Sequence, residues 1–217
     1  NDLKDHLWEG DVDGETVNGW NVIANNSNIV DDNGHGTHCA GIVCGDGTSG
    51  TTSGVAPDAN LMTVKTLAAT GTGSVDNMIA GVQFAIEHGA DILSISYGFK
   101  SYQISVAQKE LIREAFNEVL TAGAIVCAAV GNDGNTIGAP YNVDYPAACP
   151  SPWKNPDQTL TGGLSSVIAV GADDLATSSQ GPSTWQDTEI NDYQYSKWTQ
   201  YCAFTNSFDD YGGTYSS

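Results

Sequence analysis

Basic residues are scarce in this sequence: 7 Lys and Arg stand against 26 Asp and Glu in 217 residues, which gives a formal net charge of −19. Binding to nucleic acid or to an anionic membrane depends on clustered Lys and Arg, so this scarcity argues against both kinds of partner. Charged residues of both signs make up only 15% of the chain, so the imbalance reflects missing cations more than surplus acids. Such a charge favours solubility and is compatible with calcium, but it does not determine a fold.

Cysteine pairs with metal-binding spacing and long apolar runs are also missing. The five cysteines include no C-x-x-C pair, so the chain has neither zinc-site spacing nor the framework of a small disulfide-stapled domain. The sequence is still compatible with one disulfide bridge, for example between Cys149 and Cys202. The longest apolar run, residues 124–130, has the length of a strand and is too short to cross a bilayer. The chain is long enough to bury a sizeable core.

The middle of the chain alternates between strand-like and helix-like segments. Ser74 predicts the start of an amphipathic helix that ends at residues 88–89, and Gly123 predicts the end of a second helix that starts near residue 103. Residues 124–130 are almost entirely apolar, as in a strand covered on both faces. The predicted strands are residues 61–67, 91–96, 124–130 and 166–171. This order predicts an α/β fold with a three-layer, doubly wound, mainly parallel sheet, in which ligands bind beyond the carboxyl ends of the strands.

A histidine between two glycines is the strongest chemical signal. It lies in DDNGHGTHCAG, residues 31–41, where His35 is open to approach from both sides at a predicted helix start, as suits a general base. The plainer interpretation is a glycine-rich turn into a buried helix, with Asp31 or Asp32 as its cap. That interpretation does not account for Asn132, which stands in GNDG just after a buried strand. An amide donor aimed at a developing oxyanion is the expected companion of a histidine base.

Several segments together carry a family resemblance. They are GHGTHCAG at 34–41, GVAP at 54–57 with VKTL at 64–67, ILSISYG at 92–98 and AAVGNDG at 128–134. Weaker matches follow in YPA at 145–147, VIAVGA at 167–172 and SSQGP at 178–182. In this order they resemble the subtilisin-like serine proteases over most of residues 1–182. The resemblance implies a subtilisin-like fold and a serine endopeptidase with a Ser-His-Asp acyl-enzyme mechanism and no catalytic cofactor.

The resemblance assigns roles to residues of this chain. It implies that His35 is the catalytic general base, that Asn132 donates to the oxyanion, and that His38 is a structural residue facing the core. It also implies a polypeptide substrate in extended conformation, held by strand pairing beside residues 94–98 and by a primary specificity pocket. The substrate-binding candidates are Ser94, Ser96, Tyr97, Gly98, Ala128, Ala129, Val130 and Gly131, with residues 71–74 at the outer edge of the cleft. Small residues in the pocket wall leave room for a large side chain, with Asp133 at the rim. We therefore expect a preference for bulky apolar residues and some tolerance of basic ones.

Two members of the catalytic triad are not recognised in the chain. The family's aspartate follows an apolar strand in an Asp-Ser/Thr-Gly context, whereas residues 11–14, DVDG, have different surroundings. The family's nucleophile stands in Gly-Thr-Ser-Met-Ala. Ser49 shares the first three letters, but it lies only 14 residues after His35 and no helix start follows, so we reject it. We therefore expect residues 1–217 to be part of one catalytic domain, incomplete at both ends, with the aspartate strand before residue 1 and the serine helix beyond residue 217. This part alone is expected to be inactive and marginally stable.

Metal binding and location are further expectations from the resemblance. Family members commonly carry structural calcium, Asp2 matches the position of a calcium-binding carboxylate, and residues 45–53 fall where other ligands would lie. His35 and His38, with Cys39 adjacent, have the spacing of half a zinc site, but the second pair of ligands is missing. We expect an extracellular or cell-surface monomer with no nucleic-acid or membrane partner.

Two other functions stay open at this point. A subtilase homologue without catalytic activity could serve as a peptide- or protein-binding module. His35 and Asn132 argue against it, because neither is needed merely to hold the fold. A metal-dependent hydrolase would rest only on the pair His35 and His38.

Overall fold

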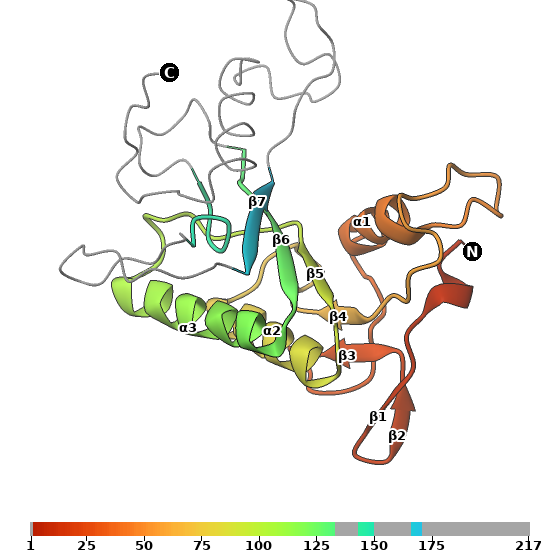
Figure 1. Ribbon diagram of the computed structural model, residues 1–217, viewed down its shortest axis with the longest axis horizontal. Helices are drawn as coiled ribbons and strands as arrows, with labels where there is room; N and C mark the ends of the chain where they lie inside the picture. Colours follow the sequence, from red (N-terminus) through yellow and green to blue (C-terminus); the bar gives the residue numbers. More distant parts are fainter. Residues whose placement is uncertain (1, 133–142, 150–165, 171–217) are drawn as a thin grey trace, which may run out of the picture. The chain divides into compact units, whose positions relative to one another are not determined.

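The computed structural model describes residues 2–132, 143–149 and 166–170, and it divides the chain into two units, Asn1–Ala90 and Asp91–Ser217 (Figure 1). The sequence shows no linker between them, and we describe each unit by itself. In the first unit the elements are η1 (Lys4–His6), β1 (Gly10–Val12), β2 (Glu15–Val17), β3 (Gly19–Asn21), α1 (His35–Cys44), β4 (Thr63–Lys65) and α2 (Val75–Glu87). In the second they are β5 (Ile92–Ile95), α3 (Val106–Ala122), β6 (Ile125–Ala129) and β7 (Val167–Val170).

Residues 11–14 lie in a hairpin of β1 and β2 that the sequence analysis did not predict. β1 and β2 pair antiparallel, and the two residues between them, Asp13 and Gly14, have φ angles of 53° and 85°. An Asp-Gly pair in this conformation matches the twist of the flanking strands. The Gly14 N–H also donates to Asp11 Oδ1 at 3.1 Å. Asp11 is therefore a β1 residue whose side chain holds the turn.

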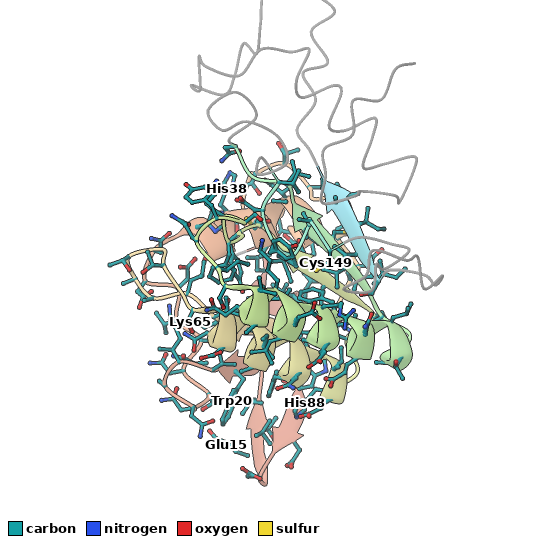
Figure 2. All side chains as sticks on the ribbon, turned by 90° about the vertical axis from the view of Figure 1, so that its left-hand side faces the viewer. Glu15, Trp20, His38, Lys65, His88 and Cys149 are labelled. Atoms are coloured by element: carbon teal, nitrogen blue, oxygen red, sulfur yellow. The ribbon has the colours of Figure 1, made fainter. Side chains whose placement is uncertain are left out.

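A short parallel sheet and the helix α2 form the core of the first unit. β3 pairs parallel with β4, with Trp20 opposite Val64. α2 starts as predicted, because the Ser74 hydroxyl accepts a hydrogen bond from the Asn77 N–H at 3.1 Å. Its buried face is apolar and packs on β4; the buried residues are Val75, Met78, Gly81, Val82, Phe84 and Ala85. Trp20 and His88, both labelled in Figure 2, stack with Phe84, and their ring centroids are 5.9 and 4.1 Å from its own.

The second unit is a parallel sheet with a helix against one face. The strand order is β5-β6-β7, and Ile92 pairs with Ile125 while Val126 pairs with Val167. α3 begins with a capping box in which the Ser105 hydroxyl accepts from the Gln108 N–H. It ends at Gly123, which has a φ of 82°, so the predicted helix is confirmed with its start three residues later. In Figure 1, α3 ends beside the start of β6.

Within the second unit, the described residues cover only one face of this sheet. Alternate residues of the strands are buried on the side of α3, among them Leu93, Ile95, Val126, Ala128 and Val167. On the opposite face Ile92 is 68% exposed, and its neighbours there are also exposed: Ile125, Ile168 and Val170. The prediction that residues 124–130 are covered on both faces is therefore not met within the described residues. An apolar run does not say which element covers each face.

Candidate active site

His35 is the first residue of α1, and its side chain is exposed. The backbone N–H of His35 donates to Asn33 Oδ1 at 3.3 Å, and its ring Nε2 lies 3.7 Å from Cys39 Sγ, one turn along the helix. A histidine at the exposed start of a helix is accessible to a substrate, as the sequence predicted for a general base.

The N-cap residue of α1 is Gly34, and the side chain of Asp31, outside the helix, bonds to the helix start. Its two carboxylate oxygens accept hydrogen bonds from the Gly34 N–H (2.8 Å), the Thr37 N–H (2.8 Å) and the Thr37 hydroxyl (2.7 Å). The Thr37 hydroxyl and these N–H groups hold the pKa of Asp31 far below its ordinary value, because they stabilise the ionised form. Of the two candidate caps, Asp31 therefore fixes the helix start that carries His35, whereas Asp32 pairs with Lys65 at 2.6 Å.

The loop that carries His35 contacts the predicted outer edge of the cleft. The Asn33 side-chain amide donates to the Ala69 carbonyl at 2.9 Å. The Ala68 N–H in turn donates to the Thr72 carbonyl at 2.9 Å, which closes the loop over residues 68–72. The structure thus brings the histidine loop and the segment that includes residues 71–74 together in the first unit.

His38 is exposed, so the expectation that it faces the core is wrong (Figure 2). The physical reason is that α1 buries only Cys44 among its residues in this structure. The described residues also supply no third ligand for a zinc ion at His35 and His38. Within the described ranges, no group of three or more His, Cys, Asp or Glu side chains is placed to hold a metal ion.

Asn132 and the predicted strand-pairing residues lie beyond or along the strands of the second unit. Asn132 follows β6 by three residues and is exposed. Ser94 and Ser96 are exposed as well, whereas Tyr97 and Gly98 are half-buried. The ring of Tyr97 meets that of Phe99 edge to face, with centroids 6.3 Å apart. Asn132 and residues 96–98 thus follow the carboxyl ends of two neighbouring strands, β6 and β5.

The predicted pocket wall divides between two faces of β6 and its extension. Ala128 and Val130 are buried, so their side chains belong to the core against α3. Ala129 and Gly131 are half-buried and alternate with them. Side chains alternate between the two faces along a strand. Of these four residues, only Ala129 and Gly131 therefore face a ligand on the side opposite α3. Asp133, expected at the rim, lies outside the described residues, as do Cys202 and residues 178–182.

Asp144 is a residue that the sequence analysis missed. Its side chain is 7% exposed and pairs with Lys100 Nζ at 3.2 Å. The Asp144 N–H donates to the Val130 carbonyl at 3.0 Å, so this carboxylate lies at the carboxyl end of β6, beside Gly131. The signal that could have found it is a lone acid in an otherwise apolar segment, residues 143–149, next to the YPA match.

Asp2 contacts the loop that was expected to supply further calcium ligands. Its carboxylate accepts hydrogen bonds from the Ser49 N–H at 2.7 Å and from the Thr51 hydroxyl. The Thr51 hydroxyl is the largest cause of the lowered pKa of Asp2. The Thr48 N–H and hydroxyl likewise hold the pKa of Asp46 below its ordinary value, while the charge of Asp2 opposes that effect. Ser49, the rejected nucleophile, is thus a loop residue that holds Asp2.

The site residues belong to two separate units. His35, the cleft edge and Asp2 lie in Asn1–Ala90, and Asn132 and the substrate-binding candidates lie in Asp91–Ser217. In the part of the chain that the structure describes, no helix combines the length and apolarity needed to cross a membrane.

A profile of the subtilase family matches residues 1–208, nearly the whole chain. The chain belongs to the subtilase family. The predicted fold class agrees with the solved structure of sphericase, which aligns with a TM-score of 0.57 at 27% identity and covers 83% of this chain and 51% of that one.

The chain is also similar in sequence to curated proteins of the subtilase family. Serine protease AprX of Bacillus subtilis (strain 168) is 36% identical over 142 residues, which are 60% of this chain and 32% of that protein. The minor extracellular protease Epr of the same organism is 33% identical over 154 residues, which are 71% of this chain and 20% of Epr. The chain thus spans about half or less of the length of these relatives. They support a serine protease function in general.

Proposed function

We propose that the protein is a serine endopeptidase in which His35 is the general base and Asn132 the oxyanion donor. The observation that supports this best is the exposure of both side chains at the ends of elements that lie in family-matched segments. A base and an oxyanion donor must reach the substrate, and the exposure of both side chains meets this requirement. The substrate is a polypeptide in extended conformation that pairs with residues 94–98.

The chemistry requires two groups besides His35 and Asn132, a nucleophilic serine and an aspartate that orients the histidine. His35 takes the serine proton as Oγ bonds to the peptide carbonyl carbon, and Asn132 donates to the resulting oxyanion. Collapse breaks the C–N bond, and the leaving amine takes the proton from His35. His35 then deprotonates a water that cleaves the acyl ester, which releases the carboxylic acid and restores the serine.

The test uses the full-length protein with fluorogenic peptides and a fluorophosphonate probe. We expect His35→Ala to lower kcat/KM by about 10⁴-fold or more, because the base acts as a unit with the nucleophile. His38→Gln is the matched control on the same helix, and it should retain activity within about tenfold, since nothing in the proposal uses His38. Full activity in His35→Ala would refute the assignment. Peptide binding by the wild type without hydrolysis or labelling would favour a non-catalytic binding module.

We also propose a structural calcium ion at Asp2. The charge of Asp2 opposes the ionisation of Asp46, and a cation beside the two carboxylates would relieve that repulsion. The Thr51 hydroxyl offers a further oxygen beside Asp2. The Ser49 N–H, a donor to Asp2, would have to turn away on binding.

An extracellular or cell-surface location is proposed for the same protein. The name of its relative Epr, an extracellular protease, supports it. Immunodetection in the culture medium and in washed cells of the source organism tests this proposal, and protein confined to the cell interior would contradict it.

A further inference from the structure

We infer that Asp144 selects a basic side chain, Lys or Arg, at the primary specificity position of the substrate. This rests on the proposed endopeptidase function and replaces the sequence-based expectation of bulky apolar residues. It arises from where Asp144 lies, from how closely the substrate-binding segments approach it, and from its charge.

The segment that carries Asp144 crosses the carboxyl ends of two neighbouring strands. The Asp144 N–H donates to the Val130 carbonyl beyond β6 at 3.0 Å. The next residue, Tyr145, exchanges two hydrogen bonds with Phe99 beyond β5, at 2.9 and 2.8 Å. Asp144 is thereby fixed between the ends of β5 and β6, the edge of a doubly wound sheet where ligands bind.

Two glycines from the predicted substrate-binding segments lie directly against Asp144. A Cβ on Gly131 would be 2.5 Å from Asp144 Oδ2, and one on Gly98 would be 2.6 Å from Asp144 Cβ. Only glycine permits approaches this close, since real Cβ atoms do not come within 3.0 Å of other heavy atoms. Gly98 belongs to the predicted strand-pairing segment and Gly131 to the predicted pocket wall. The carboxylate thus lies where those two segments meet.

One partner of Asp144, Lys100, can be exchanged for a substrate cation. A buried carboxylate needs a counter-charge, and Lys100 supplies it at 3.2 Å. The Lys100 side chain is 25% exposed, against 7% for Asp144, so it can turn to solvent when a substrate cation takes over the pairing. A Lys or Arg side chain of the substrate would then take its place, whereas an acidic side chain would be repelled. The net charge of −19 acts in the same direction, because it attracts cationic peptides over longer distances.

The experiment compares kcat/KM of the full-length protein on five peptides that differ only at the primary specificity position: Arg, Lys, Leu, Phe or Glu. We expect the wild type to cleave the Arg or Lys peptide about tenfold or more faster than the Phe peptide. Asp144→Asn should lower this ratio by about 10- to 100-fold, because the substrate charge then loses its buried partner. Lys100→Met should raise it, since the competing cation is gone.

Asp91→Asn is the matched control for charge. Asp91 is exposed and lies at the opposite, amino-terminal end of β5, so its loss should leave the ratio unchanged. A wild type that prefers Phe or Leu would overturn the inference, as would an unchanged ratio in Asp144→Asn. If Asp144→Asn does not fold, the wild-type ranking together with the Lys100→Met shift decides. A wild type that cleaves none of the peptides and does not react with the fluorophosphonate refutes the endopeptidase function itself, a result distinct from cleavage with another preference.

Discussion

At the scale of single residues, Asp31 links the sequence around His35 to the stability of the helix that carries it. Its carboxylate accepts bonds from two N–H groups of the helix start and from the Thr37 hydroxyl. A negative charge at this end also interacts favourably with the helix dipole. The variant Asp31→Asn keeps the size of the side chain but loses its negative charge and one hydrogen-bond acceptor.

We therefore expect Asp31→Asn to lower the free energy of unfolding by about 1 kcal/mol at pH 7. The pKa of Asp31 is lower in the folded than in the unfolded state, so its contribution is present above an unfolded pKa of about 4. That contribution is lost as the pH falls below about 4 toward the folded pKa, and the variant should lack this part of the acid sensitivity. Urea unfolding of the full-length protein at pH 7 and pH 3.5 measures both effects. Asp32→Asn is the neighbouring control, since its ion pair with Lys65 is half-exposed and should contribute less.

A second prediction at the scale of single residues concerns Asn132 and the rate of the reaction rather than the stability of the fold. Asn132→Ala should reduce kcat by about 10²- to 10³-fold, because the donor acts on charge that develops only in the transition state. KM should change little, since the ground-state carbonyl gains little from that bond. Steady-state kinetics of the full-length protein tests this split. A variant that raises KM alone would make Asn132 a substrate-binding residue instead.

At the scale of elements, the loop at residues 45–53 is held to the chain start through Asp2. If calcium binds there, millimolar Ca²⁺ should raise the Tm of the full-length protein, because binding to the native state alone stabilises it. Asp2→Asn should remove most of that rise. Asp13→Asn is the control, since Asp13 lies in the β1–β2 turn and outside this loop. An equal Ca²⁺-dependent rise in Asp2→Asn and in the wild type would place the ion elsewhere.

At the scale of the whole molecule, one face of the β5–β6–β7 sheet leaves a group of large apolar side chains exposed: Ile92, Ile125, Ile168 and Val170. Contiguous apolar surface of this kind is uncommon on a stable monomer. We therefore expect residues 1–217, expressed alone, to bind the dye ANS, to unfold at low urea concentration, and not to react with a fluorophosphonate. A sharply cooperative transition without dye binding, or labelling by the probe, would contradict this expectation.

What the sequence by itself determined is mostly local. Ser74 and Gly123 predict a helix start and a helix end because caps act within a few residues, and the apolar segments around them predict the parallel strands. His35 and Asn132 could be singled out because each stands in a short motif. The order of such motifs also predicts the family.

Only the tertiary structure decided which groups meet. The sequence left Asp31 and Asp32 equivalent as caps, and the folded loop distinguishes them through the bonds to Thr37 and Lys65. The scarcity of cations likewise did not indicate where the few lysines lie, and one of them is paired with Asp144. The position of Asp144 depends on hydrogen bonds to the ends of two strands, β5 and β6, that are distant from it in sequence. Contacts of that range are set by strand pairing and burial, which no local pattern contains.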